Sequence, residues 1–344
     1  MAKRVRIYKP GSWDRLIIED FHCPAPEQDE VKIDVVATGV NFADVCVRQG
    51  LYSSAKKFVG WPITPGFEVA GRVNAVGKNV KGFTVGDRVM AITLFNGYSS
   101  QVVVKAEYVR EIPSSLNFSE AASILGVFFT AYYATCWLTR VHPGSTALIH
   151  SAAGGVGLAL TQILKDAGCR VVGVVGNTNK VSVSSDYGAN IVIDKSKTDL
   201  WSALKIASPN GYDLIFDPNG LSTFKQSYNH LAPSGLLFVY GFHSMLSKSK
   251  GKRNLSLLTR DYLRTPRFNP FDMVKTNRSV IAFNVSYLFE RHDIVKEGFS
   301  FILKKFQNKT FKPLPITSYA FNNVIQAHKD IESGKTTGKL VLTF

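Results

Sequence analysis

A glycine-rich turn between a strand and a helix is the feature of this 344-residue sequence that most limits its fold. The apolar run Ala147–Ser151 predicts a short buried strand, which continues into Ala152-Ala153-Gly154-Gly155-Val156-Gly157 and then into a helix, Val156–Ala167. Strands and helices alternate from there to about residue 285, which is typical of a doubly wound parallel α/β sheet. The later predicted strands are Arg170–Val175, Ile191–Asp194, Asp213–Asp217, Leu236–Tyr240 and Val280–Val285. The later predicted helices are Asn179–Tyr187, Leu200–Ala207 and Thr223–Leu231.

The turn has the residues that a dinucleotide site needs. Gly154 lets the main chain approach a pyrophosphate closely, and Gly157 lets the helix pack tightly on the strand. The N-terminus of the helix offers free N–H groups and the positive end of a dipole to the phosphates. The alternative is a tight packing turn without a ligand, but the surrounding strand–turn–helix context favours the dinucleotide site.

The end of the second strand indicates which dinucleotide is bound. A site for NAD carries Asp or Glu about 20 residues after the glycines, where it binds the ribose 2′-hydroxyl. This sequence has Gly176-Asn177-Thr178-Asn179-Lys180 there, with no carboxylate. Lys180 is placed to meet a 2′-phosphate, so we expect NADP(H) rather than NAD. If a carboxylate were present at this position, we would interpret Lys180 as an ordinary solvated lysine at the start of a helix.

The first 120 residues follow a different pattern. Short β-branched runs, Val31–Thr38, Gly71–Val76 and Arg88–Thr93, are separated by turns rich in Gly and Pro, which predicts an antiparallel, barrel-like domain. The tail predicts two amphipathic helices and a last strand, near Ile294–Gln307, Phe321–Ser333 and Lys339–Thr343. Because the tail supplies a helix and a strand that the first domain lacks, we expect residues 1–123 and 286–344 to form one domain. Residues 124–285 are expected to form the dinucleotide domain.

Charge and cysteine content narrow the class of protein. The sequence has 41 Lys and Arg residues against 26 Asp and Glu, a formal net charge of +15. This excess of positive charge favours an anionic partner, but it does not choose between a phosphorylated cofactor, a nucleic acid and an acidic membrane. Cys23, Cys46, Cys136 and Cys169 form no CxxC pair, so neither a zinc knuckle nor a disulfide framework is predicted. The N-terminal residues show no apolar signal segment, and we expect a cytoplasmic, reduced protein.

Two stretches raise the question of a membrane. The residues between Glu120 and Arg140 are uncharged and long enough to span a bilayer, but hydroxyl side chains and Gly126 interrupt them, so we expect a buried helix between the two domains. The segment Lys248–Arg278 carries nine Lys or Arg residues and two Asp, and it predicts a surface insertion. Two interpretations of this insertion stay open. We favour a solvated cationic lid over the cleft, and the alternative is an amphipathic contact with an anionic membrane.

The first domain also carries a series of motifs in a fixed order. They are Asn41-Phe42-Ala43-Asp44, Arg48-Gln49-Gly50-Leu51-Tyr52, Pro65–Gly71, Gly82–Val89 and Thr130-Ala131-Tyr132. This series resembles the medium-chain dehydrogenase/reductases, specifically their zinc-free quinone oxidoreductase branch. Segments 41–52, 128–133, 209–213, 217–218 and 252–255 are most similar to the vesicle amine transport protein homologues. The resemblance covers essentially the whole chain and implies a GroES-like β-barrel catalytic domain beside a Rossmann-type NADP(H)-binding domain.

The same resemblance bears on zinc. In the zinc-containing relatives, a Cys and a His occupy the positions of Asn41 and Phe67. Amide and phenyl side chains cannot supply the thiolate and the imidazole that a catalytic zinc ion needs. The closely spaced cysteines of the relatives' structural zinc lobe are missing as well. We therefore expect no zinc, which disfavours the dehydrogenation of simple alcohols.

The resemblance implies hydride transfer from NADPH to an acceptor that is already electrophilic, a quinone or an α,β-unsaturated carbonyl compound. It places Asn41 and Thr130 beside the nicotinamide and Tyr52 toward the substrate. Tyr52 either donates a hydrogen bond or proton to the acceptor oxygen or only forms a wall of the cleft, and Asn41 has the alternative of capping a turn. The other implied cofactor contacts are Gly154, Gly155, Val156, Gly176, Asn177, Lys180, Lys195, Tyr240, Phe242, Phe283, Val285 and Lys339. Lys195 stands where some quinone oxidoreductases carry a Tyr on the adenosine, so stacking is replaced by a point charge.

The favoured function is therefore a zinc-independent, NADPH-dependent reductase of a quinone or enone. The alternative is a catalytically weak, cofactor-binding protein that acts at membranes through residues 248–278. Binding of single-stranded RNA ranks last, because the sequence contains no recognisable RNA-binding module. The resemblance also implies a homodimer, in which the apolar edge strand Val280–Val285 would be covered by a second copy.

Overall fold

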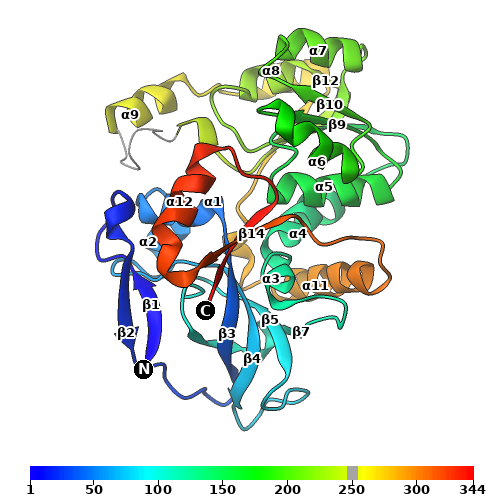
Figure 1. The fold of residues 1–344 in the computed structure, drawn as a ribbon. Helices are drawn as coiled ribbons and strands as arrows, with labels where there is room; N and C mark the ends of the chain where they lie inside the picture. Colours follow the sequence, from blue (N-terminus) through cyan, green and yellow to red (C-terminus); the bar gives the residue numbers. More distant parts are fainter. Residues whose placement is uncertain (246–254) are drawn as a thin grey trace. The chain divides into compact units, whose positions relative to one another are not determined.

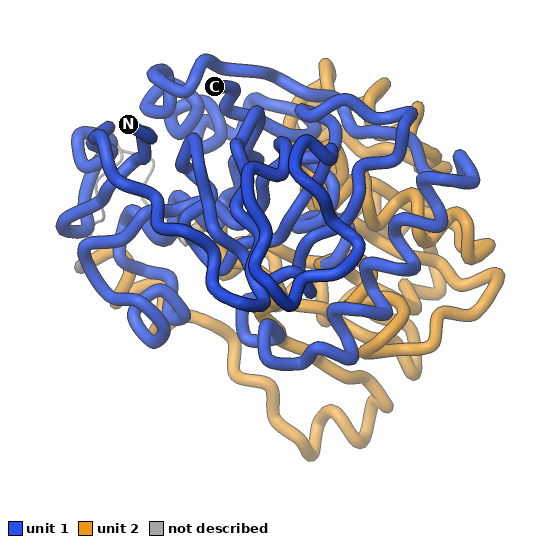
Figure 2. Tube along the Cα trace, turned by 90° about the horizontal axis from the view of Figure 1, so that it is seen from below, with its two compact units in different colours: residues 1–129, 248–252, 286–344 blue, residues 130–247, 253–285 orange. Residues whose placement is uncertain are grey.

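The computed structural model describes residues 1–245 and 255–344. The chain divides into two compact units, which Figure 2 distinguishes by colour. Unit 1 holds Met1–Phe129 and Ser286–Phe344. The described part of unit 2 consists of residues 130–245 and 255–285. Each unit is described by itself below.

Unit 1 is built on a β-sheet that uses strands from both ends of the chain (Figure 1). The order along the sheet is β14-β15-β3-β4-β5-β7, and β6 pairs with β3 off this path. The pairs are antiparallel except β14 with β15, which are parallel, so the expected antiparallel domain contains one parallel pair. The strands are β3 (Glu30–Val40), β4 (Glu68–Val76), β5 (Arg88–Ile92), β6 (Gln101–Lys105), β7 (Val109–Glu111), β14 (Ile316–Ala320) and β15 (Lys339–Thr343). A separate hairpin pairs β1 (Ala2–Arg6) with β2 (Ile17–Phe21).

A hydrophobic cluster of unit 1 combines buried side chains from β1, β3, β15 and the helices α1, α2 and α12. Strand β3 buries alternate side chains over its first half, as its apolar–polar alternation predicts, and is buried on both faces near its end. Helix α12 packs against α1 and β15, which joins the C-terminal segment to the start of the chain. The helices of unit 1 are α1 (Phe42–Arg48), α2 (Ser53–Phe58), α3 (Phe118–Ala121), α11 (His292–Gln307) and α12 (Val324–Ser333), and α4 (Leu125–Tyr132) crosses the boundary into unit 2.

Unit 2 is a parallel sheet of six strands in the order β10-β9-β8-β11-β12-β13. Strands β8 and β11 are neighbours although β9 and β10 lie between them in the sequence, so the order reverses there. Ligands of open α/β sheets bind at the carboxyl ends of the strands where the order reverses. The strands are β8 (Thr146–Ile149), β9 (Arg170–Val175), β10 (Ile191–Asp194), β11 (Tyr212–Asp217), β12 (Leu231–Val239) and β13 (Ser279–Ala282). The helices are α5 (Gly155–Asp166), α6 (Val181–Asp186), α7 (Leu200–Ala207), α8 (Phe224–Asn229), α9 (Leu255–Arg264) and α10 (Pro270–Thr276).

The predicted parallel α/β sheet is confirmed, with differences at some element ends. Strand β12 begins at Leu231 rather than at Leu236, and helix α8 ends at Asn229. The register of β11 with β12 shifts after Tyr212, and this irregularity accommodates Pro233 and Gly235 within the strand. Strand β13 ends at Ala282, and a 3-10 helix covers Val285–Leu288 where the sequence predicted the end of the strand.

The uncharged stretch 121–139 does not form the single helix that the sequence predicted. Helix α3 ends at Ala121, α4 covers Leu125–Tyr132, and a π-helical turn follows from Tyr133 to Trp137. Most of these side chains are buried, but Cys136 and Trp137 are exposed. Within residues 1–245 and 255–344, the helices are too short or too polar to span a membrane.

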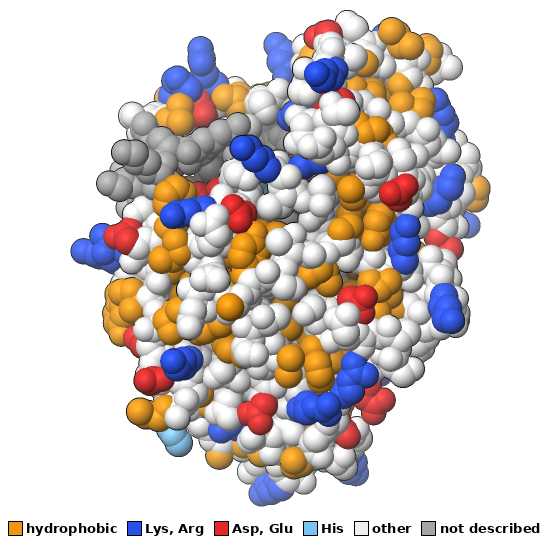
Figure 3. Space-filling model, in the orientation of Figure 1, with side chains coloured by type: hydrophobic (Ala, Val, Ile, Leu, Met, Phe, Trp, Pro, Cys, Tyr) orange, Lys and Arg blue, Asp and Glu red, His pale blue; other side chains and the backbone are white. Residues whose placement is uncertain are grey.

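Part of the basic insertion can be described. Residues 248–254 lie outside the described residues, and the remainder forms α9 and α10 in unit 2. Both helices expose large apolar side chains, which are Tyr262, Leu263, Phe271 and Val274. On the face shown in Figure 3, Lys and Arg side chains stand singly or in small groups among uncharged ones. On this face, therefore, the basic residues do not form one continuous patch.

Candidate functional site

Asn41 stands at the junction between strand β3 and helix α1. It is the N-cap residue of α1, and its backbone N–H donates to Asp44 Oδ2 at 2.8 Å. The Asp44 N–H donates back to the Asn41 carbonyl oxygen at 3.0 Å. This reciprocal pair satisfies two of the donors that a helix start leaves open, so the backbone position of Asn41 is fixed by the local sequence.

The Asn41 amide is bound by two buried charged side chains. Lys339 Nζ donates to Asn41 Oδ1 at 2.7 Å and to Glu68 Oε1 at 2.8 Å. Asn41 Nδ2 donates to the same Glu68 oxygen at 3.0 Å. The third contact of Lys339 Nζ is the carbonyl oxygen of Val40, at 3.3 Å. Because Lys339 is 3% and Glu68 1% exposed, this is a buried ion pair with a half-buried amide between its members.

Strand pairing brings these three residues together from distant parts of the sequence. Leu340 of β15 pairs with Val40 of β3, which places Lys339 beside Asn41. Val69 of β4 pairs with Thr38 of β3, which places Glu68 beside the end of the same strand. Both pairs are antiparallel, so the starts of β15 and β4 meet the end of β3. We call Asn41, Glu68 and Lys339 the Asn41 cluster.

Glycines leave room for the Glu68 carboxylate. A Cβ atom at Gly39 would lie 2.6 Å from Glu68 Oε1 and 2.4 Å from the carbonyl oxygen of Ala122. A Cβ atom at Gly126 would lie 3.2 Å from both carboxylate oxygens. The Gly126 N–H donates to Glu68 Oε2 at 2.8 Å in the first turn of α4, so the carboxylate also binds the positive end of a helix. A side chain at Gly39 or Gly126 would therefore crowd the Glu68 carboxylate.

Asp44 is a second buried carboxylate next to the Asn41 cluster. It accepts from the N–H groups of Asn41 and Gly66 and from the Tyr98 hydroxyl, at 2.8, 2.8 and 3.1 Å. Burial raises the pKa of Asp44 to about 7, although these three donors act in the opposite direction. Asp44 thus ties the start of α1 to the loop that leads into β4 and Glu68.

Tyr52 and Phe67 lie together in unit 1. Tyr52 is the N-cap residue of α2 and is half-buried, and its ring meets the Phe67 ring edge-on at 5.6 Å between centroids. Phe67 in turn packs on Phe95 at 5.1 Å. The position where zinc-containing relatives carry an imidazole is thus part of an aromatic cluster.

The glycine-rich turn lies in unit 2, between β8 and α5, as predicted. Gly154 is the N-cap residue of α5, so the N-terminal N–H groups of this twelve-residue helix follow it directly, at Gly155, Val156 and Gly157. A Cβ atom at Gly157 would lie 2.5 Å from the carbonyl oxygen of Ser151. At Gly176, by contrast, a Cβ atom would have no protein atom within 4 Å. The turn thus packs tightly at Gly157, and the carboxyl end of β9 is open at Gly176.

Two lysines approach each other at the carboxyl ends of β9 and β10. Lys180 is half-buried, and its pKa is lowered by burial and then by the positive charge of Lys195. Asp194, next to Lys195, is held by the Thr178 hydroxyl at 2.7 Å and by Ser196. An anion bound near Lys180 and Lys195 would relieve their mutual repulsion. This arrangement fits a phosphate group, and the open backbone at Gly176 leaves space for the ribose that carries it.

The remaining predicted residues of unit 2 occupy several elements. Thr130 is half-buried in the second half of α4. Tyr240 follows β12 and stacks on Phe283 at 5.9 Å between ring centroids, and Tyr133 meets Phe283 edge-on at 5.4 Å. Phe242 and Val285 are half-buried, and Asn177 directly precedes the 3-10 turn Thr178–Lys180. Tyr240 and Phe283 are thus brought together, as adjacent parallel strands require.

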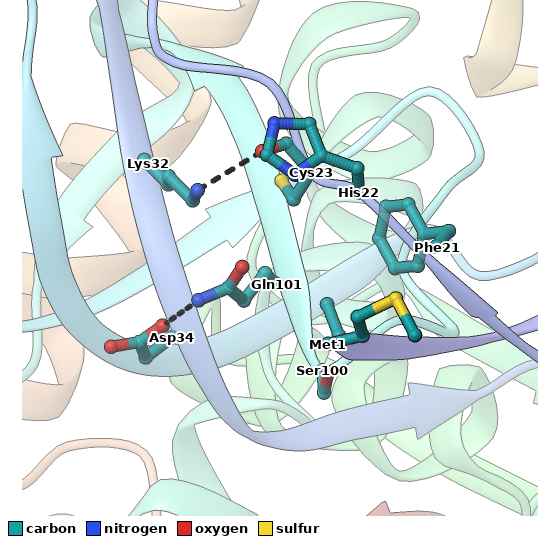
Figure 4. A pocket seen from close by; sticks show the side chains of 9 residues that line it. Met1, Phe21, His22, Cys23, Lys32, Asp34, Ser100 and Gln101 are labelled. Carbon is teal, nitrogen blue, oxygen red and sulfur yellow. Dashed lines mark hydrogen bonds between the residues drawn. The ribbon is translucent and has the colours of Figure 1, made fainter.

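An open pocket of unit 1 lies elsewhere. Met1, Phe21, His22, Cys23, Lys32, Asp34, Ser100 and Gln101 line it, and Figure 4 shows the Lys32 ammonium against the carbonyl oxygen of Cys23 and the Gln101 amide against Asp34. Asp34 lies within β3, seven residues before Asn41, which directly follows the end of this strand. At roughly 3.3 Å per residue this separates them by about 20 Å, so the pocket is not part of the Asn41 cluster.

Two functional candidates were missed by the sequence interpretation. Glu68 and Asp44 both lie in the motifs that carried the resemblance, yet neither received a role. The sequence feature that could have identified them is an acidic residue inside an apolar run, as in Phe67-Glu68-Val69-Ala70 and in Phe42-Ala43-Asp44-Val45. Carboxylates are rarely buried unless they are paired, so such placement indicates a specific partner.

Comparison with known proteins agrees with this fold. Residues 27–143 match the family described as alcohol dehydrogenase GroES-like domain, and residues 155–301 match the zinc-binding dehydrogenase family. The quinone oxidoreductase of Escherichia coli, solved in complex with NADPH, is 26% identical, with a TM-score of 0.85 over 99% of this chain and all of that one. The CurK enoyl reductase is 25% identical, with a TM-score of 0.84 over 99% of both chains.

A GroES-like domain combined with a parallel dinucleotide-type sheet defines a medium-chain dehydrogenase/reductase. The human synaptic vesicle membrane protein VAT-1 homolog is 32% identical over 334 residues, which are 96% of this chain and 84% of that protein. The chain belongs to the family of these VAT-1 homologues. The resemblance expected from the sequence is thereby confirmed, and the fold class with it.

Proposed function

We propose that this member of an oxidoreductase superfamily is an NADPH-dependent enzyme that reduces a quinone or an α,β-unsaturated carbonyl compound without zinc. The observation that carries the proposal is the Lys339 ammonium, which is bound to Asn41 Oδ1 and Glu68 Oε1. A fixed cation thus binds the side-chain oxygen of Asn41, at one of the two positions where the resemblance places a metal ligand of the zinc-containing relatives.

The residues present do not fit a catalytic zinc ion. Asn41 and Phe67 replace the thiolate and imidazole ligands, and Phe67 is packed among aromatic rings. A divalent ion on Glu68 would also meet the positive charge of Lys339, 2.8 Å from the same carboxylate. No step of the proposed reaction therefore uses a metal.

The residues of unit 2 fit NADP(H). The N-terminus of α5 offers N–H groups to a pyrophosphate, and Gly154 keeps the main chain accessible. Lys180 and Lys195 supply two positive charges for the 2′-phosphate. When bound, this cofactor supplies the hydride that reduces the acceptor. The remaining proposed contacts are those expected from the sequence, at Gly155, Val156, Gly176, Asn177, Tyr240, Phe242, Phe283 and Val285.

The chain's own residues bind and orient the acceptor in this proposal. Asn41 donates a hydrogen bond from its amide, and Thr130 stands beside the nicotinamide. Tyr52 keeps two proposed roles, a donor to the acceptor oxygen or an apolar wall with Phe67. An electrophilic acceptor suits this site, because the site offers hydrogen bonds rather than a Lewis acid to polarise it. Two structural neighbours, a quinone oxidoreductase and an enoyl reductase, support acceptors of this class.

The proposal is tested by following NADPH oxidation against a panel of quinones, enones and simple ketones, and NADP+ reduction by simple alcohols, each with and without a metal chelator. We expect turnover with members of the first two groups, slower turnover with NADH, and no effect of the chelator. Turnover confined to alcohols, or abolished by the chelator, would contradict the proposal.

A second candidate function is a cofactor-binding protein of low activity that acts at a membrane. The observation that favours it is the exposure of Tyr262 and Leu263 on α9 and of Phe271 and Val274 on α10, within a basic segment. Vesicle binding by the purified protein, combined with NADPH binding but no turnover on the panel, would select this candidate.

We also propose a homodimer and two domains at the boundaries expected from the sequence. Strand β13 is an edge of the parallel sheet, and an uncovered edge strand invites pairing with a second copy. Light scattering at micromolar concentration measures the assembly, and a mass near 38 kDa would show a monomer instead.

A further inference from the structure

We propose that Glu68 and Lys339 are positioning residues, which hold the Asn41 side-chain amide in one orientation so that it presents an N–H donor to a carbonyl oxygen. This inference rests on the proposed function, in which Asn41 contacts the reacting groups. It gives Lys339 a different role from the direct cofactor contact expected from the sequence, because its ammonium binds Asn41, Glu68 and Val40.

The two charged side chains distinguish the two ends of the amide. An ammonium group only donates hydrogen bonds, so the atom of Asn41 that faces Lys339 at 2.7 Å is the oxygen. An ionised carboxylate only accepts, so the atom that faces Glu68 at 3.0 Å is the nitrogen. A flipped amide would place a donor against the ammonium and an acceptor against the carboxylate. The ion pair therefore specifies one orientation of the amide.

This orientation leaves one donor of Asn41 for a ligand. The amide nitrogen has two hydrogens, and Glu68 accepts one of them. Asn41 is half-buried, whereas Lys339 and Glu68 are buried behind it. A group that binds to the second hydrogen must be an acceptor, and a neutral carbonyl oxygen fits because Lys339 and Glu68 already compensate each other's charge. The acceptor is either the carboxamide of the nicotinamide or the carbonyl of the substrate.

The surroundings show that the pair itself is rigid. Lys339 has three donors and three oxygen neighbours, so the ammonium is fully coordinated. Glu68 uses its second oxygen on the Gly126 N–H, and the missing Cβ atoms of Gly39 and Gly126 leave just enough space for the carboxylate. A side chain with this many fixed contacts holds a neighbour in place better than a solvated one does.

The experiment compares five variants with the wild-type enzyme, the fifth being the double variant described below with Asn41→Asp added to it. Asn41→Asp removes the N–H donor at nearly constant shape. Lys339→Met breaks the pair, and it is expected to fold poorly because the Glu68 charge stays buried without its partner. The double variant Glu68→Gln with Lys339→Met removes both charges together, so no unpaired charge stays buried and we expect it to fold. Lys335→Met is the matched control, since Lys335 is an exposed lysine of the same C-terminal segment.

The kinetic readouts separate positioning from direct cofactor contact. For the double variant we expect kcat/KM for the best acceptor to fall about 100-fold, as for the loss of one aligned donor. Adding Asn41→Asp to the double variant should cost less than 3-fold more, because the donor is already misaligned. Additive losses would overturn the proposal. A Kd for NADPH that weakens strongly in the double variant, with a reduced dependence on salt, would show a direct contact of Lys339 with a phosphate and would overturn it as well.

The single variant Asn41→Asp identifies the source of the carbonyl oxygen. If the nicotinamide carboxamide is the acceptor, the Kd for NADPH rises with the loss of activity. If the substrate carbonyl is the acceptor, the Kd for NADPH stays constant, and kcat/KM alone falls. If the folded Asn41→Asp variant shows neither a higher Kd for NADPH nor a lower kcat/KM, the proposal is overturned.

A measurement without turnover distinguishes failure of this inference from failure of the proposed function. Hydrogen exchange of the Asn41 side-chain amide, followed by NMR, should be slow in the wild type and in Lys335→Met and fast in the double variant. Slow exchange in a wild type that reduces no acceptor would leave the positioning role intact and refute the reductase. Fast exchange in an active wild type would refute the positioning role alone.

Discussion

Arg48 Nη1 lies 3.3 Å from Nδ1 of His328, and this contact determines which nitrogen of the buried imidazole carries the hydrogen. A guanidinium group only donates, so Nδ1 is the acceptor and the hydrogen is on Nε2. Nε2 lies 3.3 Å from the Tyr98 hydroxyl, which in turn donates to Asp44 Oδ2 at 3.1 Å. A directed line of hydrogen bonds therefore runs from Arg48 to the carboxylate that holds the start of α1.

The first prediction concerns the pH dependence of stability through Asp44. Burial raises the pKa of Asp44 in the folded protein to about 7, whereas the unfolded chain ionises near the ordinary value of 3.8. The stabilising contribution is complete below about pH 4 and is lost as the pH rises to 7. The free energy of unfolding of the wild type, minus that of Asp44→Asn, should therefore fall by several kcal/mol, on the order of 4, between pH 4 and 7. Urea denaturation at each pH measures this difference.

The contribution of His328 to the free energy of unfolding changes with pH in the opposite direction, so it has to be separated from that of Asp44. Burial, and then the charge of Arg48, hold its pKa well below the ordinary value of 6.5. Its contribution to stability is present above about pH 6.5 and is lost as the pH falls below that value. Because both proteins contain His328, its contribution cancels in the difference. Parallel stability curves for wild type and Asp44→Asn would contradict the assignment to Asp44.

The second prediction concerns the choice of cofactor through Lys180. Lys180→Ala should weaken NADPH binding by about 1.5–3 kcal/mol, which is roughly 10- to 100-fold, and leave the Kd for NADH nearly unchanged. The reason is that only NADPH carries the 2′-phosphate. Fluorescence titration with both cofactors measures the effect, and Lys197→Ala, at an exposed lysine nearby, is the control. Equal weakening of both cofactors would show that the phosphate site lies elsewhere.

The third prediction contrasts two glycines of the dinucleotide site. Gly157→Ala would place a Cβ atom 2.5 Å from the Ser151 carbonyl oxygen, so this variant should lower the melting temperature clearly. Gly176→Ala meets no protein atom within 4 Å, so this variant should fold normally and bind NADPH less tightly, because the methyl group occupies space meant for the ligand. Thermal unfolding and NADPH titration of both variants test the contrast. Normal NADPH binding by Gly176→Ala would remove Gly176 from the site.

The sequence allowed prediction of the parts of this protein that depend on local pattern. The turn at Gly154 and the strand Arg170–Val175 were readable because periodicity and glycine placement determine them. The break after Ala121 and the π-helical turn from Tyr133 were not, since the stretch 121–139 is uniformly uncharged and its hydropathy marks neither position. Similarly, the first half of β12 was not predicted as a strand, and it pairs with β11 only across a shift of register after Tyr212.

The Asn41 cluster illustrates why sites are harder to predict than folds. Asn41 was identified by resemblance, but its partners Glu68 and Lys339 lie 27 and 298 residues away. Only the pairing of β15 and β4 with β3 brings them together, and no local pattern encodes that pairing. Lys339 was given as a cofactor contact by the resemblance alone, and its burial with three oxygen neighbours has no local signal in the sequence.

The fourth prediction concerns metal content. The purified protein should contain zinc well below one ion per chain, and dialysis against zinc salts should not change that value. The physical reason is the Lys339 ammonium on Asn41 and Glu68 together with the apolar Phe67 ring. Elemental analysis measures the zinc content. One zinc ion per chain, retained through gel filtration, would contradict the argument from these ligands.

The last prediction concerns the basic insertion, which we expect to be a solvated cationic face. Lys250, Lys252 and Arg253 lie outside the described residues, whereas Arg260 and Lys275 stand on α9 and α10, where each pairs with an acid, Asp261 and Asp272. Neutralising Lys250, Lys252 and Arg253 should leave binding to phosphatidylserine vesicles at background and change at most the steady-state constants. If this segment bound a membrane, losing three charges would cost about 3 kcal/mol, roughly a hundredfold in affinity. Such binding would also weaken as salt is added, because screening shortens to about 8 Å at physiological ionic strength. Salt-sensitive co-sedimentation that the triple substitution abolishes would therefore favour the membrane function over the solvated face.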